Sequence, residues 1–214
     1  MTGDAALSIF LPDDMATTRL GAWFAHHADA GTVLLLSGPI GAGKTHFCRS
    51  FLRALLGPET DVPSPTFTLV QTYEAEDVEI WHADLYRLGH PDEVIELGLE
   101  AAFTTAICLV EWPDRLGDLM PPDAISIALA AEGDGRRAQI AAPGHAGLIQ
   151  ALQHDWIVRA GDPRLLAAAF AEHALLWPDA DRPSSAPPLV AGAQVTKLLR
   201  RTFAGMPAVV EGRK

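Results

Sequence analysis

The octapeptide Gly38–Thr45, which reads Gly-Pro-Ile-Gly-Ala-Gly-Lys-Thr, most constrains the fold of this 214-residue chain. It satisfies the phosphate-binding loop pattern G-x-x-x-x-G-K-[ST] at every fixed position. The glycines of such a loop let successive backbone N–H groups form a nest for anions, and the following helix directs its positive dipole end at the same anion. The pattern predicts a site for nucleotide phosphates, with Lys44 on the phosphates and the Thr45 hydroxyl on Mg²⁺.

The segments on either side of this loop have the order that it requires. Residues 32–37 form a short apolar run typical of a buried strand, and apolar side chains recur at helical spacing over residues 46–56. Strand, glycine-rich loop and helix together make a P-loop unit, which we favour over a glycine-rich turn with an exposed lysine. We therefore predict an α/β, P-loop NTPase-like three-layer fold with a mixed parallel and antiparallel central sheet.

The rest of the first 150 residues shows further strand and helix signals. Alternation and β-forming residues predict strands, and acidic or proline starts predict helices. Helix signals begin near Asp13 and at Asp92. The predicted strands cover residues 8–11, 66–73, 78–83, 105–110, 124–130 and 136–141.

The composition favours a folded chain away from membranes. Hydrophobic residues make up 49% of the sequence, and no apolar stretch approaches the roughly 20 residues that span a bilayer. The N-terminus has no basic region or apolar signal core, so we expect a cytoplasmic location. The only cysteines, Cys48 and Cys108, are predicted to be buried reduced thiols, and their spacing supports neither a disulfide framework nor a metal site.

The charge is distributed unevenly along the chain. Residues 1–150 carry 8 basic and 21 acidic side chains, whereas residues 151–214 carry 8 and 6. An acidic body argues against broad contact with the phosphates of a nucleic acid. If RNA takes part in the function, we expect another subunit to hold it.

Two acidic residues directly follow segments that we expect to be strands. Asp84 follows residues 80–83, and Glu111 follows residues 107–110. Ligands of α/β proteins gather at the carboxyl ends of strands, and a P-loop needs a carboxylate for Mg²⁺ and a group that orients the nucleophile. The spacing leaves open which acid has which role, and a solvated strand-end carboxylate is the alternative for either.

Several neighbouring side chains have both a functional and a structural interpretation. For His82, a half-buried place in the sheet is favoured over contact with phosphate or a partner. For Trp112, stacking on a ligand or partner and filling an edge of the core are equally favoured. For Arg87, a surface ion pair with the helix around Asp92 is favoured over charge stabilisation. Thr66 belongs either to a segment that senses the γ-phosphate or to an ordinary strand.

Four segments occur in an order that resembles one known family. They are Gly38–Phe47, Ser64–Val70 (SPTFTLV), His82–Leu88 (HADLYRL) and Leu109–Pro113 (LVEWP). Residues 16–21 are also similar to the opening helix of that family. The chain thus resembles TsaE, the small bacterial P-loop ATPase of tRNA N6-threonylcarbamoyladenosine synthesis, over roughly residues 8–145.

The resemblance implies a function and a set of site residues. A TsaE-type protein binds and hydrolyses ATP with Mg²⁺ to support turnover of a TsaB–TsaD complex, in which TsaD transfers threonylcarbamoyl to adenosine 37 of tRNA. The chain would reach tRNA only indirectly, through these partners. The implied catalytic residues are Glu111 and Lys44, and the implied metal ligands are Thr45, Asp84 and Glu111. The implied nucleotide-binding residues are Thr17, Gly41, Ala42, Gly43, Lys44, Thr45, His46 and Thr66.

Two positions depart from the loop that the family usually carries, GDLGAGKTT. Pro39 replaces the acidic residue, and His46 replaces the second threonine. The N–H that Pro39 lacks lies early in the loop, before the main phosphate cradle. We therefore expect the rate of hydrolysis to be affected more than nucleotide binding.

Two other classes of function use the same loop. A small-molecule or nucleotide kinase needs several arginines and a mobile lid over its second substrate, and the arginines between residues 60 and 150 form no cluster of that kind. In a non-catalytic, ATP-gated binding module, Glu111 would be merely structural.

The character of the chain changes near residue 151. We predict a P-loop ATPase domain over residues 1–150 and a helical C-terminal extension over residues 151–214, whose function the sequence does not assign. Helical spacing resumes after Asp162, and a proline-rich linker lies near residues 178–188.

Overall fold

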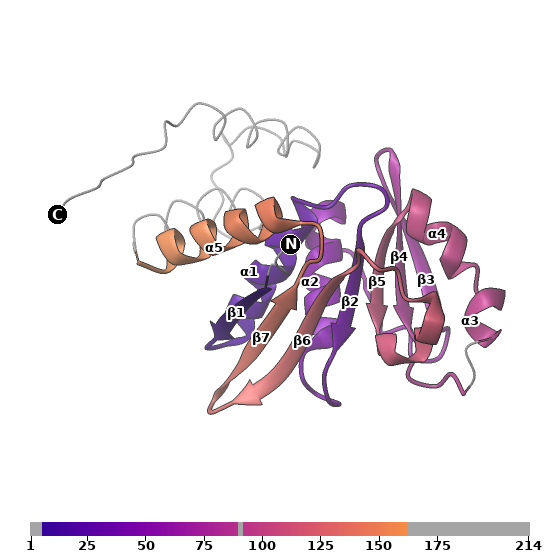
Figure 1. The fold of residues 1–214 in the computed structure, drawn as a ribbon, viewed down its shortest axis with the longest axis horizontal. Helices are drawn as coiled ribbons and strands as arrows, with labels where there is room; N and C mark the ends of the chain where they lie inside the picture. The colour runs from indigo at the N-terminus through magenta and orange to yellow at the C-terminus, as the bar shows by residue number, and fades with distance from the viewer. Residues whose placement is uncertain (1–5, 90–91, 162–214) are drawn as a thin grey trace.

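The computed structural model describes residues 6–89 and 92–161, which form one mixed sheet covered by helices (Figure 1). The strands are β1 (Ala6–Leu11), β2 (Val33–Ser37), β3 (Val70–Ala75), β4 (Val78–Asp84), β5 (Ile107–Glu111), β6 (Ile125–Glu132) and β7 (Gly135–Ala141). The helices are α1 (Asp14–Ala25), α2 (Lys44–Leu56), α3 (Asp92–Glu96), α4 (Leu99–Thr105), the 3₁₀ helix η1 (Pro113–Leu119) and α5 (Ala146–Gly161).

The sheet has parallel strands in its centre and antiparallel strands at both edges. Its order is β1-β7-β6-β2-β5-β4-β3. Strand β2 pairs in parallel with β5 and β6, and β4 pairs in parallel with β5. The pairs β1–β7, β6–β7 and β3–β4 are antiparallel. The predicted mixed sheet is confirmed.

Strand β2 shows how the sheet is covered on both faces. Leu34 and Leu36 belong to the cluster of buried residues that includes α1, α2 and α5, whereas Val33 and Leu35 belong to the cluster that includes α3, α4 and η1. Successive strand residues point to opposite faces, so an apolar strand of this kind is read as buried on both sides. The predicted three-layer arrangement is confirmed.

Capping residues mark the start of helix α1 and the end of helix α2, the two helices near the phosphate loop. The Asp13 side chain caps α1 by accepting a hydrogen bond from the Ala16 N–H at 2.7 Å. Helix α2 ends at Gly57, which has φ of 105°. The expected helix after the loop is therefore present, and its first helical residue is Lys44.

The predicted strand over residues 66–73 is wrong in its first half, since β3 begins at Val70. The carbonyl of Pro65 accepts a hydrogen bond from the Leu69 N–H at 2.6 Å, which closes a turn. Leu69 has φ of 65°, and its carbonyl accepts from the Asp84 N–H at 2.9 Å. Alternation with β-forming residues suggested a strand, but this turn holds Thr66 at the end of β4 instead.

The segment before β5 also differs from the prediction. Thr105 is the last residue of α4, and β5 begins at Ile107. Helix α4 has seven residues and follows Gly98, whose φ is 77°. So short a helix leaves little periodicity in the sequence, and for this reason the pattern predicted neither α4 nor η1.

Helix α5 runs through the predicted domain boundary at residue 150. Its Asp155 carboxylate accepts a hydrogen bond from the Trp23 indole N–H at 2.9 Å, and the Arg19 guanidinium lies 5.5 Å from the centroid of the Trp156 ring. The helix predicted after Asp162 and the proline-rich linker lie outside the described residues, so the division into two parts stays a prediction. No described helix is long and apolar enough to span a membrane.

Candidate functional site

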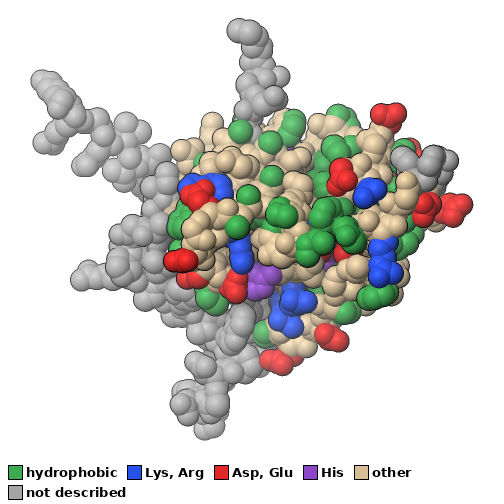
Figure 2. Space-filling model, turned by 90° about the horizontal axis from the view of Figure 1, so that it is seen from below, with side chains coloured by type: hydrophobic (Ala, Val, Ile, Leu, Met, Phe, Trp, Pro, Cys, Tyr) green, Lys and Arg blue, Asp and Glu red, His purple; other side chains and the backbone are tan. Residues whose placement is uncertain are grey.

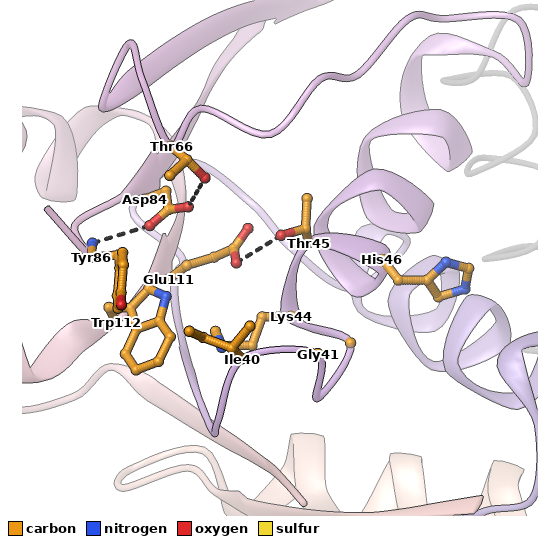
Figure 3. A pocket seen from close by; sticks show the side chains of 11 residues that line it. Ile40, Gly41, Lys44, Thr45, His46, Thr66, Asp84, Tyr86, Glu111 and Trp112 are labelled. Carbon is orange, nitrogen blue, oxygen red and sulfur yellow. Dashed lines mark hydrogen bonds between the residues drawn. The ribbon is translucent and has the colours of Figure 1, made fainter. Parts of the chain in front are cut away.

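A pocket of about 350 Å³ lies where the parallel strands β2, β5 and β4 end (Figure 3). Leu36 of β2 is paired with Glu111 of β5, and Glu111 is paired with Asp84 of β4. Because parallel strands end at the same edge, the sheet brings both carboxylates beside the loop that follows β2. The predicted site residues that line the pocket are Gly41, Gly43, Lys44, Thr45, His46, Thr66, Asp84 and Glu111.

The phosphate loop is shaped by glycines at its start and at its end. Gly38 has φ of 132°, and a Cβ there would lie 2.2 Å from the carbonyl oxygen of Leu129. Only glycine fits so close to β6. Gly43, with φ of 102°, stands at the N-cap of α2 and makes no side-chain cap hydrogen bond. The first N–H groups of α2 therefore belong to residues that line the pocket, as anion binding at a helix N-terminus requires.

Lys44 is held inside the loop. Its ammonium donates hydrogen bonds to the carbonyls of Gly38 at 2.7 Å and Pro39 at 3.0 Å, and it lies 4.0 Å from the centroid of the Trp112 ring. Burial lowers the pKa of Lys44, while the nearby Glu111 and Asp84 carboxylates act in the opposite direction. A cation placed in this way matches a polyphosphate ligand.

Glu111 is fixed by partners on two regular elements. Its Oε2 accepts a hydrogen bond from the Thr45 hydroxyl of α2 at 2.9 Å, and its Oε1 lies 3.0 Å from His82 Nε2 of β4. A carboxylate can only accept, so His82 donates through Nε2. His82 and Glu111 are 0% and 2% exposed. The structure thus buries His82 fully, where the sequence suggested a half-buried sheet position, and it orients the carboxylate beside the pocket.

Asp84 has a different kind of environment, made by loop groups. Its Oδ2 accepts a hydrogen bond from the Thr66 hydroxyl at 2.6 Å, and its Oδ1 accepts from the Tyr86 N–H at 3.0 Å. The hydroxyls of Ser64 and Thr66 are 2.8 Å apart. The turn before β3 is therefore connected directly to the carboxylate at the end of β4 (Figure 3).

Trp112 and Tyr86 form one wall of the pocket. Trp112 has φ of 60°, a left-handed conformation that costs a side-chain-bearing residue of the order of 1–2 kcal/mol. Its ring lies 4.9 Å from that of Tyr86, centroid to centroid. Trp112 lines the pocket and also packs against the edge of the core cluster that includes α4 and η1, so both interpretations of this residue stay open. Arg87 lies over the Phe67 ring, 4.2 Å from its centroid.

Two predicted nucleotide-binding residues, Thr17 and Ala42, are not among the residues that line the pocket. Thr17 is completely buried, and its hydroxyl accepts a hydrogen bond from Arg136 Nη1 at 3.1 Å. His46 does line the pocket, but its ring points away from it in Figure 3, and its Nε2 lies 3.0 Å from the Thr18 hydroxyl. Helix α1 thus meets the loop through these polar contacts.

Three further residues stand at the site although the sequence reasoning gave them no role. Ile40 and Tyr86 line the pocket. Arg136 Nη1 lies 3.2 Å from the place that a Cβ on Gly43 would take, and it donates to Asp14 Oδ1 at 2.8 Å. Arg136 comes from β7, far along the chain, and nothing in the local sequence of β7 signals this contact.

Together, these side chains offer two chemical functions in one place. The loop supplies backbone N–H groups and an ammonium for an anion, and the opposite side supplies a hydroxyl and two carboxylates. Oxygen ligands of this kind suit a hard cation such as Mg²⁺. The arrangement suits the binding of nucleotide phosphates.

Comparisons with known proteins agree with the motifs. Residues 11–139 match the family model described as threonylcarbamoyl adenosine biosynthesis protein TsaE. The tRNA threonylcarbamoyladenosine biosynthesis protein TsaE of Rickettsia conorii is 39% identical over 127 residues, which cover 59% of this chain and 73% of that relative. The protein of the same name from Haemophilus influenzae is 33% identical over 148 residues, which cover 66% of this chain and 93% of that relative.

A solved structure has the same fold. The crystal structure of Bacillus subtilis YdiB is 29% identical, superposes with a TM-score of 0.59, and matches 70% of this chain and 96% of that chain. The P-loop NTPase-like fold is confirmed by this likeness, and the predicted family by the matches above. The chain therefore belongs to the TsaE family of tRNA threonylcarbamoyladenosine biosynthesis.

Proposed function

We propose that this chain is the Mg²⁺-dependent ATPase of the machinery that makes threonylcarbamoyladenosine at tRNA position 37, and that it supports turnover of a TsaB–TsaD complex. The observation that carries the proposal is the contact between the Thr45 hydroxyl and Glu111, 2.9 Å apart, beside the carboxylate of Asp84. It joins the start of α2 to Glu111, and the register of β4 and β5 places Asp84, the second acid that the chemistry needs, beside Glu111.

Each group of pocket residues has its own role in binding the nucleotide, the metal ion or the attacking water. The loop N–H groups and Lys44 bind the phosphates, and Thr45, Asp84 and Glu111 hold Mg²⁺, which neutralises phosphate charge when bound. Glu111 also orients the attacking water, because its carboxylate is held in place by two hydrogen bonds. Thr66 links the preceding turn to the metal side through Asp84.

Helix α1 contacts the residues beside the phosphate loop through Thr17 and Thr18. Thr17 contacts Arg136, which also lies against Gly43 of the loop. We assign Thr17 and His46 to the side where the base and sugar bind, with Gly41, Ala42 and Gly43 forming the loop around the phosphates. Ala42 is buried, and its N–H closes the start of that loop by donating to the carbonyl of Pro39 at 3.1 Å.

The lining of the pocket favours hydrolysis over transfer to a second substrate. No arginine lies among the lining residues within the described part of the chain. Kinases use clustered arginines and a lid to hold an acceptor and to exclude water. Water as the acceptor suits this open pocket better.

The mouth of the pocket has features of a protein-binding face. Ile40 and Phe67 are 76% and 80% exposed, and Tyr86 is 43% exposed. Viewed from below the sheet, hydrophobic side chains gather near the middle of this face (Figure 2). Exposed apolar patches mark interaction sites, so we assign this face to the TsaB–TsaD partners. Because residues 1–150 are acidic, we propose that the chain reaches tRNA only through those partners. The proposed location is the cytoplasm.

Reconstitution tests the proposal directly. Purified chain is combined with TsaB, TsaD, the enzyme that forms threonylcarbamoyl-AMP, tRNA and Mg-ATP, and modified tRNA and released phosphate are measured over many turnovers. We expect both to fall strongly when the chain is omitted or carries Lys44→Ala. Arg137→Ala, which removes an exposed positive charge that pairs with Glu132, is the control and retains activity. Unchanged multiple turnover with Lys44→Ala would rule the proposal out.

A further inference from the structure

A second cluster of potential ligands lies behind the nucleotide pocket. Cys48 of α2, His82 of β4 and Glu111 of β5 each place one ligand atom so that all three atoms lie within 4.8 Å of one another. The residues are 0%, 0% and 2% exposed. Only Glu111 also lines the pocket, so it is shared between the pocket and the cluster.

The ligand types in this cluster select a particular class of ion. A thiolate, an imidazole and a carboxylate are the three side chains that bind zinc in proteins. Magnesium prefers oxygen ligands and keeps several waters, so a sulfur and a nitrogen ligand disfavour it. The pocket and the cluster therefore suit different ions, although they have Glu111 in common.

We propose that Cys48, His82 and Glu111 bind a zinc-class divalent ion, and that this ion inhibits the nucleotide site. The binding part stands on the cluster alone, whereas the inhibitory part rests on the function proposed above. The cluster could not be predicted from the sequence, because its three residues are distant along the chain. They meet only because α2 packs on β4 and β5.

Small movements are enough to form the site. Zinc bonds of about 2.0–2.3 Å in tetrahedral geometry place ligand atoms roughly 3.3–3.8 Å apart. His82 Nε2 and Glu111 Oε1 are already 3.0 Å apart, and the largest separation in the cluster, at most 4.8 Å, has to shorten by roughly 1 Å. The fourth position is left for a water.

The proton balance indicates a reversible site. Cys48 loses its thiol proton to solvent as the metal–sulfur bond forms, and coordination through His82 Nε2 moves the ring proton to Nδ1. Within the described residues, His82 Nδ1 is buried and has no hydrogen-bond partner. An unpaired buried N–H weakens binding. We therefore expect looser binding than at a structural zinc site, which lets the ion come and go.

The shared carboxylate explains why the two functions exclude each other. Glu111 Oε2 now accepts from the Thr45 hydroxyl, on the side of the phosphate loop. An ion held by Cys48 and His82 takes Glu111 Oε1 as its third ligand, in place of the hydrogen bond that Oε1 now accepts from His82. A carboxylate engaged by this ion is not free to orient water or to hold Mg²⁺.

Cobalt titration of the full chain tests binding without any need for activity. Chelator-treated protein is titrated with Co²⁺, and the thiolate-to-cobalt charge-transfer band in the near ultraviolet is recorded. We expect the band in the unaltered chain and its loss in Cys48→Ala. Cys108→Ala is the matched control, because Cys108 is an equally buried thiol that packs on the opposite face of the sheet, and it keeps the band.

Two results would overturn the binding claim. One is the absence of the band in the unaltered chain, and the other is a band that persists in Cys48→Ala. Circular dichroism verifies that the variants fold. Cys48→Ser, which keeps the size of the side chain but supplies no thiolate, replaces Cys48→Ala if the latter does not fold, and it too loses the band.

Zinc titration of ATP hydrolysis tests the inhibitory claim. At fixed Mg-ATP, we expect Zn²⁺ to inhibit the unaltered chain and Cys108→Ala alike, and we expect at least a tenfold higher zinc concentration to be needed for Cys48→Ala. Equal inhibition of Cys48→Ala contradicts the claim. If no hydrolysis is found at all, the proposed function fails, while the cobalt band still decides whether the metal site exists.

Discussion

The two carboxylates at the edge of the sheet are neighbours in register, yet they are held by different parts of the molecule. Glu111 is bonded to Thr45 at the start of α2 and to His82 inside β4. Asp84 is bonded to Thr66 in a turn and to the backbone N–H of Tyr86 in the next loop. One acid is attached to the rigid core, and the other to the loops around the pocket.

This contrast suggests a division between chemistry and control. A group that orients a nucleophile must be held within a small fraction of an ångström, and regular elements give that precision better than loops do. Loops absorb conformational change more readily. We infer that Glu111 sets the rate of the chemical step and that Asp84 senses the state of the turn at Pro65–Leu69.

The largest expected effect follows from removing the charge of Glu111. Glu111→Gln keeps the size of the side chain but cannot act as a base, so ATP hydrolysis falls by about 100-fold or more while nucleotide binding is retained. Phosphate release and calorimetric titration with ATP measure the two quantities. Asp118→Asn, at an exposed acid of η1, is the control and has near-normal turnover. Normal hydrolysis by Glu111→Gln would show that Glu111 does not set the rate of the chemical step, and the proposed difference in role between Glu111 and Asp84 would be wrong.

The corresponding change at Asp84 is expected to act through the metal. Asp84→Asn weakens an oxygen ligand of Mg²⁺ but leaves Glu111 in place, so hydrolysis falls by roughly tenfold or more and higher Mg²⁺ concentrations restore part of it. Magnesium titrations at saturating ATP measure the shift. A loss that Mg²⁺ does not relieve at any concentration would mean that Asp84 acts in the chemistry itself.

Removing the buried partner of Glu111 should affect both stability and rate. His82→Ala leaves Glu111 without one hydrogen bond in the core, which costs about 1–3 kcal/mol of unfolding free energy and lowers hydrolysis several-fold. His82→Gln offers an amide N–H toward Glu111 and recovers part of both. Chemical denaturation and phosphate release are measured on the same samples. If Gln and Ala behave alike, the hydrogen bond to Glu111 is not what His82 contributes.

The smallest effect is expected at the loop partner of Asp84. Thr66→Ala removes the hydrogen bonds of this hydroxyl with Asp84 and with Ser64, each worth about 0.5–1.5 kcal/mol, so we expect hydrolysis to fall roughly two- to tenfold with little change in melting temperature. Thr66→Ser keeps the hydroxyl and retains activity. Thr68→Ala, an exposed threonine of the same turn, is the matched control. A large loss of stability in Thr66→Ala would show that the turn is part of the rigid core.

The central part of the fold could be predicted because its signals are local. The apolar run of β2, the glycine loop and the periodic apolar face of α2 stand next to one another in the sequence, and each matches its own template. Asp84 and Glu111 could be named as candidates because both follow apolar strands. Their placement side by side depends on the register between β4 and β5, which no local pattern contains.

The misplaced strand start and the unpredicted contacts have non-local causes. The alternation of residues 66–69 fits a strand, but the hydrogen bond from Leu69 to Pro65 closes a turn there. Arg136 reaches the loop only because β7 folds back beside β6. Cys48 meets His82 and Glu111 only after α2 packs on the sheet. These contacts are decided by tertiary packing, which single-sequence patterns do not report.

Helix α5 has a practical consequence for shortened versions of this protein. A chain cut at residue 150 loses Asp155 and Trp156, and with them the hydrogen bond to Trp23 and the contact with Arg19. It also loses the buried Leu152, which packs in the same cluster as α1. Such a chain would expose apolar surface and be prone to aggregate. Deletions intended to test the tail should therefore begin after Gly161, where the described helix ends.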